Sequence, residues 1–158
     1  MSTKAKLPVL VLILLITLGI GAIGAWVTAP AIPSWYAALN KPSFNPPNWL
    51  FAPVWSALYC LMSVAIWLAW RRAPGSQASL LLTVYGIQLA ANLLWSILFF
   101  AGHLPSLALA DCLLLAILIA WMIRLSGKAS RLAAWLLVPY LLWVSFAALL
   151  NAAIIALN

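Results

Sequence analysis

Apolar residues fill five long stretches of this chain, and short polar turns or one longer segment separate them. The stretches cover residues 7–27, 47–70, 79–101, 104–123 and 132–157. Each has about the 20 apolar residues that a helix needs to cross a bilayer. The strands of a membrane β-barrel would instead alternate between apolar and polar over about 10 residues. The pattern therefore predicts an all-α membrane protein, a single bundle of five transmembrane helices.

The composition supports this interpretation and limits the number of domains. Hydrophobic residues make up 68% of the chain and charged residues 6%, whereas soluble domains carry about 25% charge. A water-soluble fold of 158 residues has too little interior to hide so much apolar surface. No polar stretch is long enough to form a second domain, so we expect one transmembrane domain over residues 1–158.

The positive charge of the chain is distributed unevenly between the two sides of the predicted bundle. The formal net charge is +7, yet with five spans only Lys41 falls on the side of the first loop. The basic residues on the other side are Lys4, Lys6, Arg71, Arg72, Arg124, Lys128 and Arg131. Basic residues concentrate on the cytoplasmic side of membrane proteins. We therefore expect a protein of the bacterial cell membrane with a cytoplasmic N-terminus, an outside C-terminus and first loop, and basic residues that contact lipid headgroups rather than nucleic acid.

The segment at residues 28–46 differs from the other connections in its length and composition. It leads into the motif at 35–49, which reads WYAALNKPSFNPPNW. Proline fixes φ and removes a hydrogen-bond donor, so this backbone should be stiff without forming a regular helix. Long ordered loops are commonly lids or binding elements, while Trp and Tyr also form belts at membrane surfaces. The sequence favours a Pro/Trp-rich lid, with an interfacial belt as the alternative.

Once this topology is applied, the polar residues and the mid-span tryptophans inside the spans converge on the outer half of the bundle. The unusual residues of the spans are Trp55, Tyr59 and Met62 in the second stretch, Gln88, Asn92 and Trp95 in the third, and Trp135, Pro139, Trp143, Ala147 and Asn151, spaced four apart, in the fifth. Most of these side chains should share the outer half of the bundle, beneath the first loop. Indole and phenol rings suit a large planar ligand with a few polar groups. The alternative is that they only pack the bundle, with amides bonding between helices.

Few residues offer reactive chemistry, and no catalytic or metal-binding motif is present. Asp111 is the only acidic residue, so we expect it to face the interior, hydrogen-bonded or protonated, in a structural or ligand-orienting role rather than in a proton relay. His103 would either face the membrane interface or ligate a haem iron. Cys60 and Cys112 lie singly in predicted spans and favour packing roles. Two-carboxylate acid–base catalysis is excluded by the lone acidic residue.

Several sequence motifs, in their order along the chain, resemble the pattern of one protein family. The motifs are WYxxLxKPxxxPP at 35–47, Trp55 with Tyr59 and Met62, Gln88-Leu89 with Asn92 and Trp95, Asp111, and Pro139-Tyr140 with Trp143, Ala147 and Asn151. Together they resemble the tryptophan-rich sensory protein/translocator protein family, also called peripheral benzodiazepine receptors. The resemblance implies a five-helix bundle, usually homodimeric, with a ligand cavity that the first loop caps.

The same resemblance implies ligands and the residues that contact them. The implied ligands are porphyrins such as protoporphyrin IX and haem, sterols in some members, and synthetic hydrophobic molecules, with no obligatory cofactor. The ligand-binding set that we predict comprises Tyr36, Trp55, Tyr59, Asn92, Trp95, Trp143, Ala147 and Asn151. The function that follows is a membrane sensor or regulator of tetrapyrrole handling. Light-dependent porphyrin degradation and small-molecule transport are the alternatives.

Overall fold

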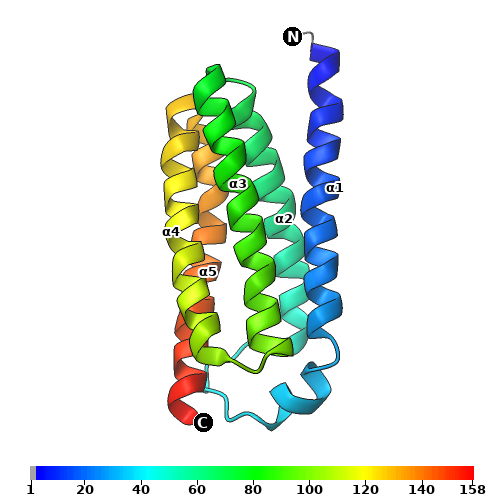
Figure 1. Ribbon diagram of the computed structural model, residues 1–158, viewed down its shortest axis with the longest axis vertical. Helices are drawn as coiled ribbons and strands as arrows, with labels where there is room; N and C mark the ends of the chain where they lie inside the picture. Colours follow the sequence, from blue (N-terminus) through cyan, green and yellow to red (C-terminus); the bar gives the residue numbers. More distant parts are fainter. Residues whose placement is uncertain (1–2) are drawn as a thin grey trace.

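The computed structural model describes residues 3–158, with side chains from residue 7 onward (Figure 1). Its α-helices are α1 (Thr3–Thr28), α2 (Asn48–Trp70), α3 (Gly75–Ser96), α4 (Pro105–Ala129) and α5 (Arg131–Leu157). Two π-helical turns add η1 (Ile32–Tyr36) and η2 (Ile97–Ala101), and residues 3–158 contain no strand. All five α-helical segments are long and apolar enough to cross a membrane. The predicted all-α architecture is therefore confirmed.

Several helix boundaries differ from the prediction, because helices extend beyond the apolar residues that reveal them; α1, for example, begins at Thr3 rather than at residue 7. The helix α3 begins at Gly75, before the predicted residue 79, and α4 continues to Ala129, past the predicted residue 123. The extension of α4 carries Arg124 and Lys128, and long basic side chains are good helix formers. The connection between the predicted stretches 104–123 and 132–157 shrinks to Ser130. Its Oγ accepts a hydrogen bond from the backbone N–H of Ala133 at 3.3 Å and caps α5.

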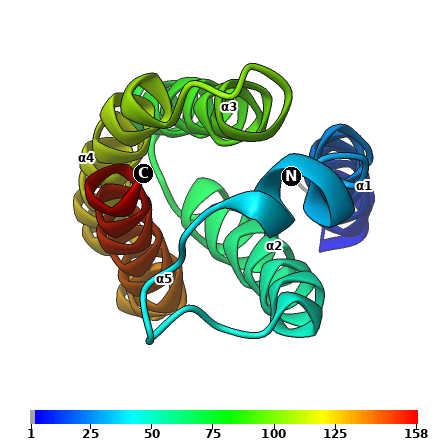
Figure 2. The same ribbon diagram turned by 90° about the horizontal axis from the view of Figure 1, so that it is seen from below.

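The helices alternate in direction and form a ring in the order α1, α2, α5, α4, α3 (Figure 2). The segment 29–47, the turn at 102–104 and the end of α5 lie at one end of the bundle, which we call the loop end (Figure 1). The α2–α3 turn and Ser130 lie at the other, which we call the basic end. The helix α1 packs against α2, α3 and η2 and makes few or no contacts with α4 and α5, so it lies at the side of the bundle.

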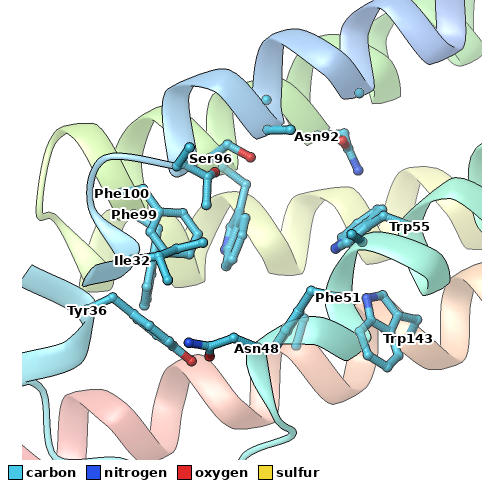
Figure 3. A pocket seen from close by; sticks show the side chains of 18 of the residues that line it. Ile32, Tyr36, Asn48, Phe51, Trp55, Asn92, Ser96, Phe99, Phe100 and Trp143 are labelled. Carbon is cyan, nitrogen blue, oxygen red and sulfur yellow. The ribbon is translucent and has the colours of Figure 1, made fainter. Parts of the chain in front are cut away.

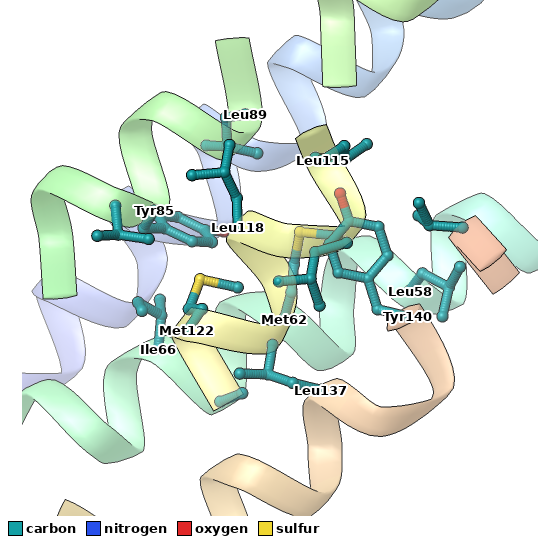
Figure 4. Packing of buried hydrophobic residues seen from close by; sticks show 14 of the residues in the cluster. Leu58, Met62, Ile66, Tyr85, Leu89, Leu115, Leu118, Met122, Leu137 and Tyr140 are labelled. Carbon is teal, nitrogen blue, oxygen red and sulfur yellow. The ribbon is translucent and has the colours of Figure 1, made fainter. Parts of the chain in front are cut away.

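The tightly packed core lies in the half of the bundle toward the basic end. Met62 and Ile66 on α2, Leu81 on α3 and Met122 on α4 are completely buried there. Figure 4 shows Met62, Ile66 and Met122 within this cluster. Met62 had been expected among the ligand-facing residues of α2, but it belongs to this core. A close-packed core of this kind holds the helices rigidly. The helix ends at the loop end are thereby fixed around a space that the core does not fill.

Candidate functional site

A cavity of about 450 Å³ occupies the bundle at the loop end (Figure 3). Its wall comes from α1, α2, α3, η2, α5 and the segment 29–47. The helix α4 contributes no lining residue. The volume falls within the roughly 300–1,000 Å³ typical of small-molecule and cofactor sites.

Aromatic rings form two groups that face each other across this cavity (Figure 3). Trp55 and Trp143 make up the first group, from α2 and α5. Tyr36, Phe99 and Phe100 make up the second, with Phe99 and Phe100 in an edge-to-face contact at 4.9 Å between ring centroids. Trp55, Trp143 and Phe100 are half-buried and line this space, whereas Phe99 is buried and stacks on Trp95 at 5.2 Å between ring centroids. An aromatic lining of this kind suits a flat apolar ligand.

A chain of hydrogen bonds closes the deep side of the cavity. The Tyr59 hydroxyl donates to Asn92 Oδ1 at 2.9 Å, and Asn92 Nδ2 donates to the Tyr140 hydroxyl at 3.1 Å. The Tyr140 hydroxyl donates in turn to Gln88 Oε1 at 2.8 Å. Gln88 and Asn92 stand one helical turn apart on α3, so both amides reach the same network. Such buried networks hold each member in one orientation, so Asn92 and Tyr59 present fixed polar atoms to the cavity.

All eight residues of the predicted ligand-binding set line this one cavity. They are Tyr36, Trp55, Tyr59, Asn92, Trp95, Trp143, Ala147 and Asn151. Their placement agrees with the depth argument made from the topology, while their contact with a ligand stays a prediction. The predicted series of ligand-facing residues spaced four apart along α5 is only partly right. Trp135 is 70% exposed and Pro139 is also exposed, so neither faces the cavity. Residues four apart drift by about 40° per step around a helix of 3.6 residues per turn, so the first two members point to the outside.

Asp111 and His103 both lie outside the cavity wall. Asp111 is buried on α4, as expected, but its Oδ2 has no hydrogen-bond partner within residues 3–158. His103 stacks on Trp35 with 4.3 Å between ring centroids and takes a positive φ of 53° in the turn before α4. Within the described residues, no group of three or more His, Cys, Asp or Glu side chains gathers to hold a metal ion. A haem-ligating role for His103 at this cavity is therefore not supported by its position.

The segment 29–47 is more helical than its prolines suggested. The backbone N–H of Tyr36 donates to the carbonyl of Ala31 at 2.8 Å, which is the spacing of a π-helix, and a proline stands in the first turn of η1. This turn points the Tyr36 ring into the cavity wall, where its hydroxyl donates to Asn45 Oδ1 at 3.0 Å. Burial raises the pKa of Tyr36, and the bond to Asn45 offsets part of that rise.

Two further contacts hold the segment 29–47 over the bundle. The backbone N–H of Asn40 donates to Asn158 Oδ1 at 3.0 Å, and Asn158 Nδ2 donates to the carbonyl of Asn40 at 3.0 Å. On the other side, Trp35 contacts Phe99 edge-to-face at 5.4 Å in addition to its stack on His103. The segment is thus attached to α5 and to the α3–α4 turn, with the cavity beneath it.

The sequence did not reveal the contribution of α1 to the cavity. A side chain at Gly21 would collide with the ring of Tyr59, and a Cβ at Gly24 would lie 3.4 Å from Ser96 Oγ. The small residues of α1 thus let this helix approach α2 and α3 and face the cavity. This favours packing within the chain over a dimer contact for that face. The small residues Gly19, Gly21, Gly24 and Ala25 predict a face of close helix packing, within the chain or in a homodimer. They do not show that this face also lines the cavity, because α1 is apolar all round.

The cavity reaches the surface of the bundle between α1 and α2. Ala22 and Ala25 on α1, and Ala52 and Ser56 on α2, line the cavity and are also exposed. The cavity wall is therefore exposed on the side of the bundle where α1 and α2 meet.

Comparison with known proteins places these features in one family. The model of the TspO/MBR family matches residues 12–157. A tryptophan-rich protein TspO of Archaeoglobus fulgidus is 41% identical over 149 residues, which cover 94% of this chain and 96% of the relative. A tryptophan-rich sensory protein of Cereibacter sphaeroides is 37% identical, with 88% of each chain covered. The human translocator protein is 40% identical over 124 residues, covering 74% of this chain and 70% of its own length.

Proposed function

This chain belongs to the TspO/MBR family of integral membrane proteins, and from this premise we propose that it is a membrane sensor that binds a porphyrin in the cavity at the loop end. The ligand class includes protoporphyrin IX and haem, together with other flat hydrophobic molecules. The names of the relatives, a sensory protein and translocator proteins among them, agree with a regulatory role.

The observation that carries this proposal is the pair of facing aromatic groups with a polar floor. Trp55 and Trp143 on one side and Phe99 and Phe100 on the other leave room for a flat ring system between them (Figure 3). Stacking on aromatic faces contributes to binding without demanding one particular ring substituent. The amide of Asn92 at the floor supplies a polar contact that fixes the orientation of the ligand.

The ring, rather than a central metal ion, is the part of the ligand that these residues recognise. The cavity wall contains no His, Cys, Asp or Glu, so a haem iron would receive no ligand of those types from it. The residues fit a metal-free porphyrin and a haem equally, since both present the same flat apolar faces. We therefore expect binding to depend on the macrocycle and its edges.

We propose Lys41 as the charge partner for the carboxylates of a porphyrin; in the structure its Nζ donates to the carbonyl of Leu39 at 3.0 Å. Lys41 is the one Lys or Arg at the loop end within the described residues. Its Nζ lies 4.8 Å from the centroid of the Tyr36 ring, and that ring lines the cavity. A porphyrin with its carboxylates toward Lys41 would keep them near water and its ring between the aromatic groups.

The signal is the change that the ligand produces in the segment 29–47. Ile32 and Tyr36 belong both to this segment and to the cavity wall. A ligand that contacts them favours the closed position of the segment over any open one, and this differential contact shifts the population toward closure. The segment then acts as the lid whose position reports occupancy to whatever protein or lipid contacts the loop end.

The placement of charge supports an orientation in the bacterial cell membrane. Arg71, Arg72, Arg124, Lys128 and Arg131 lie at the basic end, which we therefore place in the cytoplasm, with the segment 29–47 outside. We also propose a homodimer whose contact lies away from the inward face of α1. The accessibility of introduced cysteines and the molar mass of the solubilised protein test these two statements. Labelling of the loop end from the cytoplasm, or a monomer at all concentrations, would contradict them.

A titration with protoporphyrin IX in the dark, followed by the Soret band, tests the proposed function. Ala147 lines the cavity, and Ala147→Phe places a ring in the ligand space, while Ala57→Phe adds the same ring on the exposed side of α2. We expect saturable binding that Ala147→Phe weakens at least tenfold, about 1.4 kcal/mol, and that Ala57→Phe leaves unchanged. Equal, non-saturating uptake by all three proteins would mean that porphyrin only partitions into detergent, and would refute the proposal.

A further inference from the structure

A second hollow lies on the outer side of α4, at the basic end and far from the cavity. It is an open, shallow depression whose lining residues all belong to this one helix: Ile117, Ala120, Trp121, Arg124, Leu125 and Lys128. These residues recur every three or four positions, so they form one stripe along the helix. We call this stripe and its hollow the α4 groove.

The cations of the α4 groove lack an anionic partner in the protein. Arg124 and Lys128 are exposed, and within residues 3–158 neither makes a hydrogen bond or an ion pair. The only acidic residue, Asp111, lies about 20 Å away along the axis of α4, toward the loop end, at about 1.5 Å of rise per residue. Two basic side chains one turn apart are therefore available to an anion from outside the chain.

Two neighbouring cations at the basic end, Arg71 and Arg72, contact groups within the protein. The guanidinium of Arg71 lies 4.3 Å from the centroid of the Trp67 ring. Arg72 Nη1 donates to Ser130 Oγ at 2.9 Å and links the α2–α3 turn to the start of α5. These contacts occupy Arg71 and Arg72 within the protein, whereas Arg124 and Lys128 are left to face the groove.

The apolar part of the groove runs from these cations toward the middle of the membrane. Ile117 is 66% exposed and Trp121 45% exposed. Residues 117–128 span about 16 Å along the helix, close to half of a hydrocarbon core of about 30 Å. The indole of Trp121 stands between the basic and the apolar residues, at the level where tryptophans meet lipid headgroups. The stripe thus matches one leaflet in length and in its change from charged to apolar.

We propose that the α4 groove is a binding site for one anionic glycerophospholipid. Arg124 and Lys128 hold its phosphate, since guanidinium and ammonium groups both bind phosphate oxygens through charge-assisted hydrogen bonds. Ile117 and Trp121 contact its acyl chain. A second copy of this chain fits the groove less well, because a symmetric contact would bring the same cations of two protomers together. The charge of the groove thus selects an anionic lipid as its occupant.

Competition between lipids tests this proposal on the full-length protein. The protein, solubilised in a mild detergent, is offered equal amounts of phosphatidylglycerol and phosphatidylcholine, and bound lipid is counted by native mass spectrometry. We expect at least a tenfold preference for phosphatidylglycerol, about 1.4 kcal/mol. Arg124→Gln should abolish this preference. Arg131→Gln removes the same charge from an exposed residue at the same end, outside the groove, and should retain it.

A variant that fills the groove separates a defined site from general charge attraction. Ala120→Trp changes no charge and places a large side chain among the lining residues, so it should displace the lipid as well. Thermal unfolding of each variant in detergent confirms that the bundle is intact. An equal loss of preference in Arg124→Gln and Arg131→Gln, or no preference in the wild-type protein, would overturn the proposal. A change of oligomeric state in Ala120→Trp with lipid retention unaltered would also overturn it, in favour of a protein contact.

Discussion

The close approach of α1 to α2 at Gly21 yields a prediction that two glycines on one helix can test. A Cβ at Gly21 would collide with ring atoms of Tyr59, whereas a Cβ at Gly19 meets nothing within 4 Å. Both positions lie in the interior of α1, so both alanine substitutions share the gain in helix propensity, roughly 0.5–1 kcal/mol. The difference between Gly21→Ala and Gly19→Ala therefore isolates the collision with Tyr59.

The size of that difference in stability depends on two costs at Tyr59, the crowding of its ring and the loss of its hydrogen bond. Inserting a methyl group into a close-packed contact costs about 1–3 kcal/mol. Moving the Tyr59 ring also separates its hydroxyl from Asn92 Oδ1, now at 2.9 Å, and a side-chain hydrogen bond inside a membrane protein contributes about 0.6 kcal/mol. We expect Gly21→Ala to be less stable than Gly19→Ala by about 1.5–3.5 kcal/mol.

Equilibrium unfolding in mixed micelles with increasing dodecyl sulfate, followed by tryptophan fluorescence, measures the two stabilities. Gly21→Ala should also bind protoporphyrin IX more weakly, because Tyr59 lines the cavity. Gly19→Ala should bind it as the wild-type protein does. Surface substitutions commonly change stability by up to about 0.5 kcal/mol. If the stabilities of the two variants agree within this range, the packing of α1 against α2 described above is refuted.

Three further predictions concern the floor, the mouth and the lid of the cavity. Tyr140→Phe removes a completely buried hydroxyl that donates to Gln88, and it should lower the free energy of unfolding by about 1–3 kcal/mol; an unchanged unfolding midpoint would contradict the network. Lys41→Met should weaken the binding of protoporphyrin IX several-fold but leave its dimethyl ester unaffected, as measured by the same Soret titration, and equal losses for the two ligands would exclude a charge partnership. Asn158→Ala removes both reciprocal hydrogen bonds to Asn40 and should speed hydrogen–deuterium exchange in the segment 29–47, whereas unaltered exchange would mean that other contacts hold the lid.

The arrangement of the helices was largely predictable because a membrane imposes simple rules on sequence. Apolar runs of span length predicted the number of helices, and consecutive spans of one bilayer must alternate in direction. From these two steps the shared depth of Trp55, Asn92 and Trp143 followed, and the structure brings all three to one cavity. The ends of the helices were less predictable, since α4 keeps its helical hydrogen bonds through Arg124 and Lys128 after its apolar run has ended.

The remaining parts of the cavity depend on contacts between segments that no local pattern announces. In the sequence, Gly21 is one of several small residues of the first span. Only the position of the Tyr59 ring on α2 shows why a side chain at residue 21 would not fit. Phe99 and Phe100 lie in the π-helical turn η2, whose wider spacing rotates them relative to a continuous α-helix. The prolines near η1 suggested an irregular loop, although proline in a first turn is compatible with a helix. Tyr140 sits among apolar residues of α5, and its role emerges only with its partners on α3.

The central claim is that a porphyrin occupies the cavity beneath the segment 29–47. An experimental structure of the protein with protoporphyrin IX, determined in lipid nanodiscs, tests it most directly. The account predicts the macrocycle between Trp55 and Trp143 on one side and Phe99 and Phe100 on the other, with its carboxylates toward Lys41. A porphyrin bound on the lipid-facing surface of the helices, with the cavity vacant beneath a closed segment, would contradict it.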